Sequence, residues 1–131
     1  MFTQKYVIIF SMGIKISIGC DIEEISRFSG KTREKDSDFL NRIYTDSELE
    51  YCYKTSNSAQ HLCGRYCVKE AVVKALTDFD IKDVYYSDIE VLNKESGMPF
   101  VKISKYPDLN IKVSLSHCKT YATASALIIC E

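Results

Sequence analysis

The fold is built around the stretch SAQHLCGRYCVKEAVVKAL, residues 58–76, which is the longest helical pattern in the chain. Ser58 is placed to cap the start of this helix. Apolar side chains recur along it at helical spacing and predict a buried stripe made of Leu62, Tyr66, Val73 and Leu76. A second face, within about 60° of arc by helical geometry, collects Cys63, Cys67, Glu70 and Lys74.

Upstream of the helix, apolar residues stand at every second position from Ile14 to Ile22. This alternation predicts a half-buried strand, with Gly19 and Asp21 on the face opposite the isoleucines. Short helical patterns follow at residues 23–28, 38–44 and 46–53. In the last of these, Asp46 is predicted to be the N-cap, and Glu48 and Glu50 lie near the positive end of the helix dipole.

Downstream of Thr77 the periodicity changes to that of strands, at residues 88–91, 99–103, 113–117 and 121–129. Ala122, Ala124 and Ala126 share one face of the last strand, where their small size allows close packing. Helices flanked by strands, without a βαβ rhythm, predict an α+β fold. We expect a small antiparallel or mixed sheet packed with one long helix and several short helices.

Length and composition restrict the class of protein. A chain of 131 residues suits one domain, assigned to residues 12–131, and a net charge of −1 gives no general attraction to nucleic acid. Residues 1–11 are interpreted as an N-terminal extension, either disordered or preceding the true start at Met12. Their apolar run is too short to span a bilayer and leads to no signal cleavage site. The six cysteines are therefore predicted to be reduced, in a cytoplasmic protein without a membrane partner.

Three charged residues form a candidate site for phosphate chemistry. Glu70 and Lys74 are four residues apart on the helix and, taken alone, are typical of a solvated ion pair. Asp21 at the end of the first strand is, taken alone, typical of a turn or a helix cap. Together the two carboxylates could hold Mg²⁺, which binds one or two carboxylates and completes its shell with water and phosphate oxygens. Lys74 would neutralise the remaining phosphate charge.

Two other features have simpler interpretations. Cys63 and Cys67 imitate part of a zinc site, but no second cysteine pair is suitably placed, so we interpret them as small apolar side chains. His117 ends a strand, where a lone histidine is typically structural or exposed. A cysteine-based metal or redox protein is nevertheless a rival hypothesis.

Six segments in the same order resemble the holo-acyl-carrier-protein synthase family of 4′-phosphopantetheinyl transferases. The first two are IGCDIEEISRF at residues 18–28 and FLNRIYTDSEL at residues 39–49. The third and most specific, GRYCVKEA at residues 64–71 with Lys74-Ala75, is similar to the family signature Arg-Phe-x-x-Lys-Glu-Ala-x-x-Lys-Ala. Residues 88–91, 97–99 and 113–117 then follow in family order. The resemblance covers residues 13–128.

The resemblance implies transfer of phosphopantetheine from coenzyme A to a serine of an apo acyl carrier protein, with adenosine 3′,5′-bisphosphate as the second product. Asp21 and Glu70 would bind Mg²⁺, and Lys74 would contact the diphosphate, so these three are the predicted catalytic residues. A metal-bound water or Glu70 would take the serine proton. The coenzyme A site would be lined, besides Lys74, by Arg65, Lys69, Pro99, Ser116 and His117.

The resemblance also implies partners. Arg27 and Arg42 would belong to a basic surface that docks the acidic carrier protein, and small members of the family are homotrimers, so we expect a trimer. The chain departs from the family pattern at residues 77–82, which contain no glycine. A carrier-binding module with weak or lost coenzyme A chemistry is therefore the alternative function. Fatty-acid synthesis and specialised polyketide or peptide synthesis are both open as the pathway of the carrier.

Overall fold

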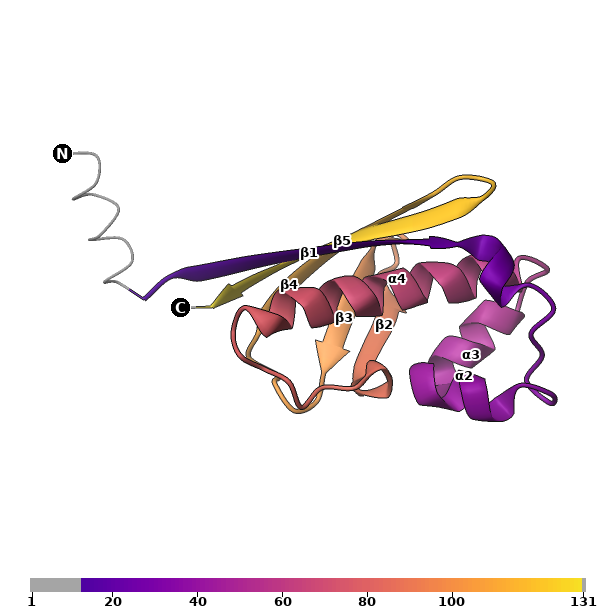
Figure 1. Cartoon of the computed structure of the whole chain (residues 1–131), viewed down its shortest axis with the longest axis horizontal. Coiled ribbons are helices and arrows are strands. Elements are labelled where there is room, and N and C mark those ends of the chain that lie inside the picture. The colour runs from indigo at the N-terminus through magenta and orange to yellow at the C-terminus, as the bar shows by residue number, and fades with distance from the viewer. Residues whose placement is uncertain (1–12, 131) are drawn as a thin grey trace.

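The computed structural model describes residues 13–130, and the predicted N-terminal extension, residues 1–11, lies outside them. The fold is α+β, as the sequence predicts, with one long helix lying along a sheet and short helices beside the first half of that helix (Figure 1). In chain order the elements are β1 (Lys15–Glu24), the 3-10 helix η1 (Ile25–Phe28), α2 (Ser37–Ile43), α3 (Asp46–Tyr53), α4 (Ser58–Thr77), the 3-10 helix η2 (Tyr86–Asp88), β2 (Ile89–Asn93), β3 (Pro99–Ile103), β4 (Asn110–His117) and β5 (Tyr121–Cys130).

The strands form two antiparallel sheets. β5 is the central strand of a three-stranded sheet with the order β1-β5-β4, and β2 pairs with β3 in a separate hairpin. The predicted alanine face of β5 is confirmed, because Ala122, Ala124 and Ala126 are at most 3% exposed. These small side chains let α4 lie close to the sheet. In the register, Asp21 of β1 lies opposite Ala124.

The orientation of β1 is the reverse of what its alternation suggests. The isoleucines face outward, with Ile18 and Ile22 76% and 62% exposed, while Ser17 is buried against α4. The Ser17 hydroxyl donates a hydrogen bond to the Ala75 carbonyl at 2.7 Å. Gly19 is the reason for this close approach, since a Cβ atom at that position would overlap the α4 backbone at Ala71 and Ala75. The small polar face of β1 therefore packs inward, and the aliphatic face is exposed.

The N-cap of α3 is one residue earlier than predicted. Its N-cap is Thr45, whose side chain accepts from the Glu48 amide, while the Glu48 carboxylate accepts from the Thr45 amide at 2.8 Å. Asp46 is therefore the first helical residue and not the cap. This capping box satisfies two of the amides that a helix start leaves without partners.

α4 is buried along most of its length. Leu62 and Leu76 of the predicted stripe are fully buried, and Tyr66 and Val73 are partly buried. Eleven of its residues are buried in all: Leu62, Cys63, Gly64, Arg65, Cys67, Val68, Lys69, Ala71, Val72, Ala75 and Leu76. A surface helix would show a single apolar stripe, whereas α4 is enclosed between the sheet, the β2–β3 hairpin and the short helices. Within residues 13–130, no helix is long and apolar enough to cross a membrane.

The turn after α4 adopts a conformation that usually calls for glycine. Asp80 has a φ of 59°, in the left-handed region. The chain reverses there with the Ile81 amide donating to the Leu76 carbonyl at 3.2 Å. Aspartate tolerates this region better than most residues do, which explains how residues 77–82 turn without a glycine.

Candidate active site

Asp21 and Lys74 meet where β1 crosses α4. The Lys74 ammonium lies 3.3 Å from Asp21 Oδ1 and donates to the Cys20 carbonyl at 2.9 Å. The Asp21 side chain is only 10% exposed, and the Lys74 side chain is 54% exposed. Asp21 Oδ2 is buried and accepts no hydrogen bond from any residue of the described chain. An acceptor of this kind is costly to bury unless a ligand completes it.

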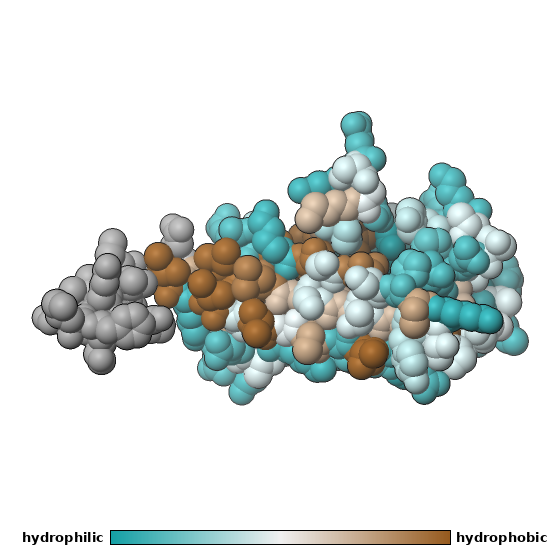
Figure 2. Space-filling view, turned by 90° about the horizontal axis from the view of Figure 1, so that it is seen from above, coloured by the Kyte–Doolittle hydropathy of each residue, from teal (hydrophilic) through white to brown (hydrophobic). Residues whose placement is uncertain are grey.

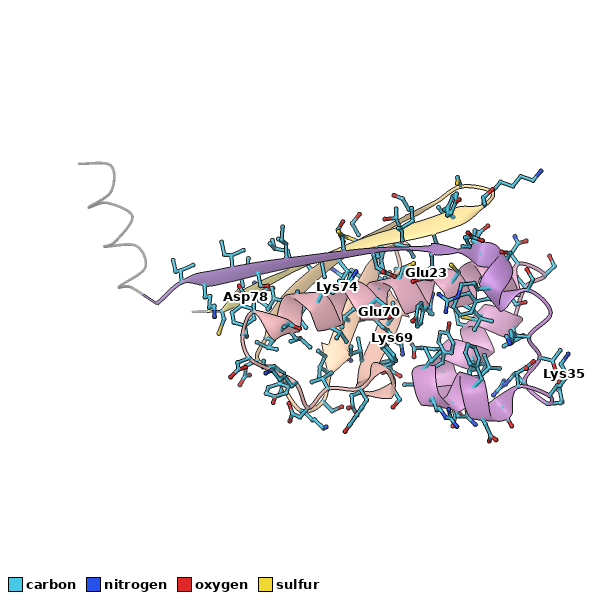
Figure 3. The ribbon with its side chains drawn as sticks, in the orientation of Figure 1. Glu23, Lys35, Lys69, Glu70, Lys74 and Asp78 are labelled. Atoms are coloured by element: carbon cyan, nitrogen blue, oxygen red, sulfur yellow. The ribbon has the colours of Figure 1, made fainter. Side chains whose placement is uncertain are left out.

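Glu70 lies one turn before Lys74 on α4, as Figure 3 shows. Residues four apart on a helix project from the same side, so the ion pair between Lys74 and Asp21 places Glu70 on the side of the helix that faces Asp21. Glu70 Oε1 accepts hydrogen bonds from the hydroxyls of Tyr66, at 2.7 Å, and Tyr86, at 2.8 Å.

The pKa values of Tyr66 and Tyr86 are raised in this region. Burial and the hydrogen bond to Glu70 raise the pKa of Tyr66. Burial likewise raises the pKa of Tyr86, and the charges of both Glu70 and Asp21 add to that rise. Both phenols therefore stay protonated at neutral pH and act as donors. Glu70 accepts hydrogen bonds from both phenols, and the charge of Asp21 adds a smaller effect on Tyr86.

The donor set suits Mg²⁺ and does not suit structural zinc. It consists of two carboxylates, one of them with an unpartnered buried oxygen, and a neighbouring ammonium group. Magnesium binds proteins through one or two carboxylates in this way. Among residues 13–130, no group of three or more His, Cys, Asp and Glu side chains could enclose a metal ion.

A second group of predicted residues gathers near the first half of α4. Arg65 is 4% exposed, donates to Asn93 Oδ1 at 2.6 Å, and lies with its guanidinium 4.0 Å from the centre of the Tyr51 ring. Asn93 is the register partner of Pro99 in the β2–β3 hairpin. Arg65 is thus held against the end of β2, next to Pro99 at the start of the neighbouring strand β3.

His117 lies close to this group. Its Nε2 atom is 3.1 Å from the Gln60 side-chain nitrogen, and Ser116 precedes it on β4. Burial lowers the pKa of His61, and the charges of Arg65 and His117 lower it further, which places the three basic side chains in one neighbourhood. His61, Gln60 and Asn93 were not among the predicted site residues, because no local pattern distinguishes them.

Lys69 is predicted to contact coenzyme A, but the structure encloses it in the core. Its side chain is 0% exposed, and its ammonium donates to Glu48 at 2.7 Å and to the backbone carbonyls of Ile43 and Tyr86. Glu48 is equally buried and also accepts from the Val91 amide at 3.0 Å. All three ammonium protons are used inside the fold, so Lys69 joins α4 to α3 and to the turn before β2.

The remaining predicted residues lie on the surface or in the core. Arg27 is exposed, bonds to Glu23, and lies over the Tyr66 ring at 5.6 Å, and Arg42 is exposed on α2. Cys63 and Cys67 are buried, and the Cys67 thiol donates to the Ala122 carbonyl at 3.3 Å. The two cysteines thus fill the space between α4 and the sheet, as small apolar side chains do.

Comparison with known proteins points to one family. The model of the 4′-phosphopantetheinyl transferase superfamily matches residues 17–126. A protein of Protochlamydia amoebophila named holo-[acyl-carrier-protein] synthase is 39% identical over 117 residues, which cover 86% of this chain and 96% of the relative.

Two solved structures have a similar fold. A holo-(acyl-carrier-protein) synthase of Bacillus anthracis in complex with coenzyme A (3′,5′-ADP) has a TM-score of 0.70 and 28% identity, and the match covers 88% of this chain and 96% of that one. The Helicobacter pylori holo-[acyl-carrier-protein] synthase in complex with coenzyme A also has a TM-score of 0.70 and 28% identity, with coverage of 85% and 98%.

Proposed function

The chain belongs to the 4′-phosphopantetheinyl transferase superfamily, and we propose from this membership that Asp21, Glu70 and Lys74 form its active site. The enzyme transfers the 4′-phosphopantetheine group from coenzyme A to a serine of an apo acyl carrier protein. The serine oxygen forms a bond to the β-phosphorus of coenzyme A. The bond from that phosphorus to the bridging oxygen breaks, adenosine 3′,5′-bisphosphate leaves with the bonding electron pair, and the serine proton would pass to a water molecule or to Glu70.

The observation that carries the assignment is the unpartnered oxygen of Asp21. Oδ2 is buried beside Lys74 without a hydrogen bond from the described residues, while Glu70 lies on the same side of α4. Asp21 and Glu70 would hold Mg²⁺, which would supply positive charge to the coenzyme A diphosphate. Lys74, half-exposed and already oriented by Asp21, would contact the same diphosphate and offset the charge that develops on it.

The cluster near the first half of α4 supports a coenzyme A site. The Arg65 Nε atom is buried there without a partner in the described chain. His117 lies beside Gln60, Ser116 precedes it on β4, and Pro99 is the register partner of Asn93, which accepts a hydrogen bond from Arg65. Coenzyme A is strongly anionic, so the Arg65 guanidinium would pair with one of its phosphates, and the neighbouring polar side chains would donate hydrogen bonds to it. We leave Lys69 out of this set because it is enclosed by the fold.

The carrier protein would dock on the surface around η1 and α2. Arg27 and Arg42 are exposed there, and the segment between them adds Lys31, Arg33 and Lys35 together with three acidic residues, Glu34, Asp36 and Asp38. Arg27 pairs with Glu23 and Lys31 with Asp36, so the excess of positive charge is small. Hydrophilic side chains gather at this end of the molecule in Figure 2, away from the brown patch at the other end. A local basic surface on a chain of net charge −1 attracts an acidic partner by steering, and that attraction weakens with salt.

We propose that three copies of the chain assemble. The outward face of β1 exposes Ile14, Ile16, Ile18 and Ile22, and a groove of about 600 Å³ runs beside it along β4 and β5 with Lys74 at its edge. An aliphatic face of this extent favours a protein partner, and a second copy would bury it next to the active site. Ile18→Lys should then give a monomer in sedimentation analysis. A variant that keeps the trimeric mass would contradict this interface, and a monomeric mass of the unsubstituted protein would contradict the trimer.

All six cysteines are free thiols, which is typical of a reducing compartment, and we place the protein in the cytoplasm.

The function is tested by incubating the protein with coenzyme A, Mg²⁺ and a panel of apo carrier proteins, followed by intact-mass spectrometry. We expect one carrier to gain the mass of a single phosphopantetheine group on its serine. Glu70→Gln should abolish most of this gain, and Glu95→Gln, at an exposed turn, should not. Carrier binding without a mass gain would favour the alternative of a binding module. The carrier that reacts fastest identifies the pathway.

A further inference from the structure

Glu70 is held by two phenols that bond to the same oxygen. The hydroxyls of Tyr66 and Tyr86 both donate to Oε1, at 2.7 Å and 2.8 Å. Among residues 13–130, no side chain or amide donates to Oε2. A glutamate on a helix ordinarily samples several rotamers, but two donors on one oxygen select a single orientation of the carboxylate.

Tyr66 is itself held in place by its neighbours. It precedes Glu70 by one turn of α4, and its ring lies 5.6 Å from the ring of Phe28, which is 2% exposed. It lies equally close, at 5.6 Å, to the ring of Tyr86. The Arg27 guanidinium covers it at 5.6 Å. Aromatic pairs in tilted contact at this separation are mutually stabilising, so neither phenol is free to swing away from Glu70.

Tyr86 is fixed through its backbone by a buried ion pair. Its carbonyl accepts from the Lys69 ammonium at 2.9 Å, and Lys69 pairs with Glu48 at 2.7 Å. Both of these side chains are 0% exposed. Lys69 therefore anchors the η2 turn to α4. Tyr86, the first residue of this turn, donates its hydroxyl to Glu70, which follows Lys69 on α4. The buried Lys69 thus fixes Tyr86 at its carbonyl, and Tyr86 in turn fixes the Glu70 carboxylate.

We propose that Tyr66 and Tyr86 are positioning residues that hold Glu70 ready for the metal ion, with Oε1 occupied by the phenols and Oε2 presented to the ion. The inference rests on the proposed role of Glu70. Hydrogen bonds from a second set of residues to a metal-binding carboxylate restrict its rotation before the ion arrives. Tyrosine is suited to this position because its neutral hydroxyl donates without adding a positive charge that would compete with the cation.

The test compares metal affinity in variants that lose only a hydroxyl. Mn²⁺ alone is titrated into the full chain and followed by water-proton relaxation. We expect Tyr66→Phe and Tyr86→Phe each to weaken Mn²⁺ binding several-fold, and the double variant to weaken it by about 10- to 100-fold. The Mg²⁺ concentration for half-maximal activity should rise in the same order, while the Michaelis constant for the carrier protein stays unchanged.

Tyr106→Phe is the matched control. Its hydroxyl donates to Asp83 Oδ1 at 2.6 Å in an exposed turn, so it loses the same kind of bond outside the site. Urea unfolding of every variant separates a loss of metal affinity from a loss of structure. If the double variant binds Mn²⁺ as Tyr106→Phe does while Glu70→Gln binds it weakly, the positioning inference is wrong and the active site stands. If Glu70→Gln also binds normally, both are wrong.

Discussion

The close contact between β1 and α4 depends on Gly19, and replacing it with alanine should break that contact. A Cβ atom at residue 19 would lie 2.9 Å from the Ala75 amide nitrogen and 3.1 Å from the Ala71 carbonyl carbon, with the Ala71 oxygen nearer still. These are backbone atoms of a buried helix, so no side chain can rotate away. Strand and helix must separate by roughly 1 Å to restore ordinary contact distances. The Ser17–Ala75 hydrogen bond and the packing on both sides are then lost.

We expect Gly19→Ala to lower the free energy of unfolding by at least about 3 kcal/mol, which is the upper range for overpacked cores. Urea unfolding followed by circular dichroism at a fixed protein concentration measures this change. Gly64→Ala is the control, because the three atoms nearest to its Cβ would all belong to the flexible Leu115 side chain, the first of them at 3.2 Å. The gain in helix propensity there, about 1 kcal/mol, offsets the crowding. Equal effects of the two substitutions would refute the reasoning.

Three further predictions concern docking, pH and the turn after α4. Arg27→Ala should raise the Michaelis constant for the carrier protein about three- to tenfold and leave that for coenzyme A unchanged, whereas Lys82→Ala should change neither; equal effects of Arg27→Ala on both constants would exclude a docking role. Burial raises the pKa of the Cys52 thiol from 9.0 to about 12, so the unfolded chain loses this proton first and stability falls as the pH rises from 9 to 12. In that range the free energy of unfolding of the native protein should fall by up to about 1.4 kcal/mol per pH unit more than that of Cys52→Ala. If urea unfolding gives both proteins the same dependence of this free energy on pH, the assignment to Cys52 is wrong. Asp80→Gly should raise the free energy of unfolding by about 0.5–1 kcal/mol, because glycine adopts a positive φ without strain, and a destabilised variant would show that the aspartate side chain is needed there.

The order and type of the elements could be predicted because each leaves a local pattern. The alternation in β1, the alanine face of β5 and the helical spacing of residues 58–76 all correspond to elements of the structure. The direction that β1 faces could not be predicted from alternation, which distinguishes two faces without saying which of them is buried. Gly19 could have indicated the buried face, since a glycine among larger residues permits a helix to approach the strand on that side.

Contacts that the sequence did not predict join residues distant in the chain. Glu48 and Lys69 were each interpreted alone, as a helix-start charge and as a ligand contact, although they form one buried pair across 21 residues. A charged pair is enclosed only when both members and their hydrogen bonds come together, and spacing on a single helix cannot reveal it. Tyr66 could have been found by its spacing of four from Glu70, whereas Tyr86 is brought there by the fold.

The claim on which the account depends is that Asp21 of β1 and Glu70 of α4 bind one metal ion. It is tested most directly by crystals of the protein grown with coenzyme A and Mn²⁺, because an anomalous difference map locates manganese without reference to the protein atoms. We predict one peak within bonding distance of a carboxylate oxygen of each residue, beside the diphosphate. A manganese ion bound to the diphosphate but to neither carboxylate would contradict it.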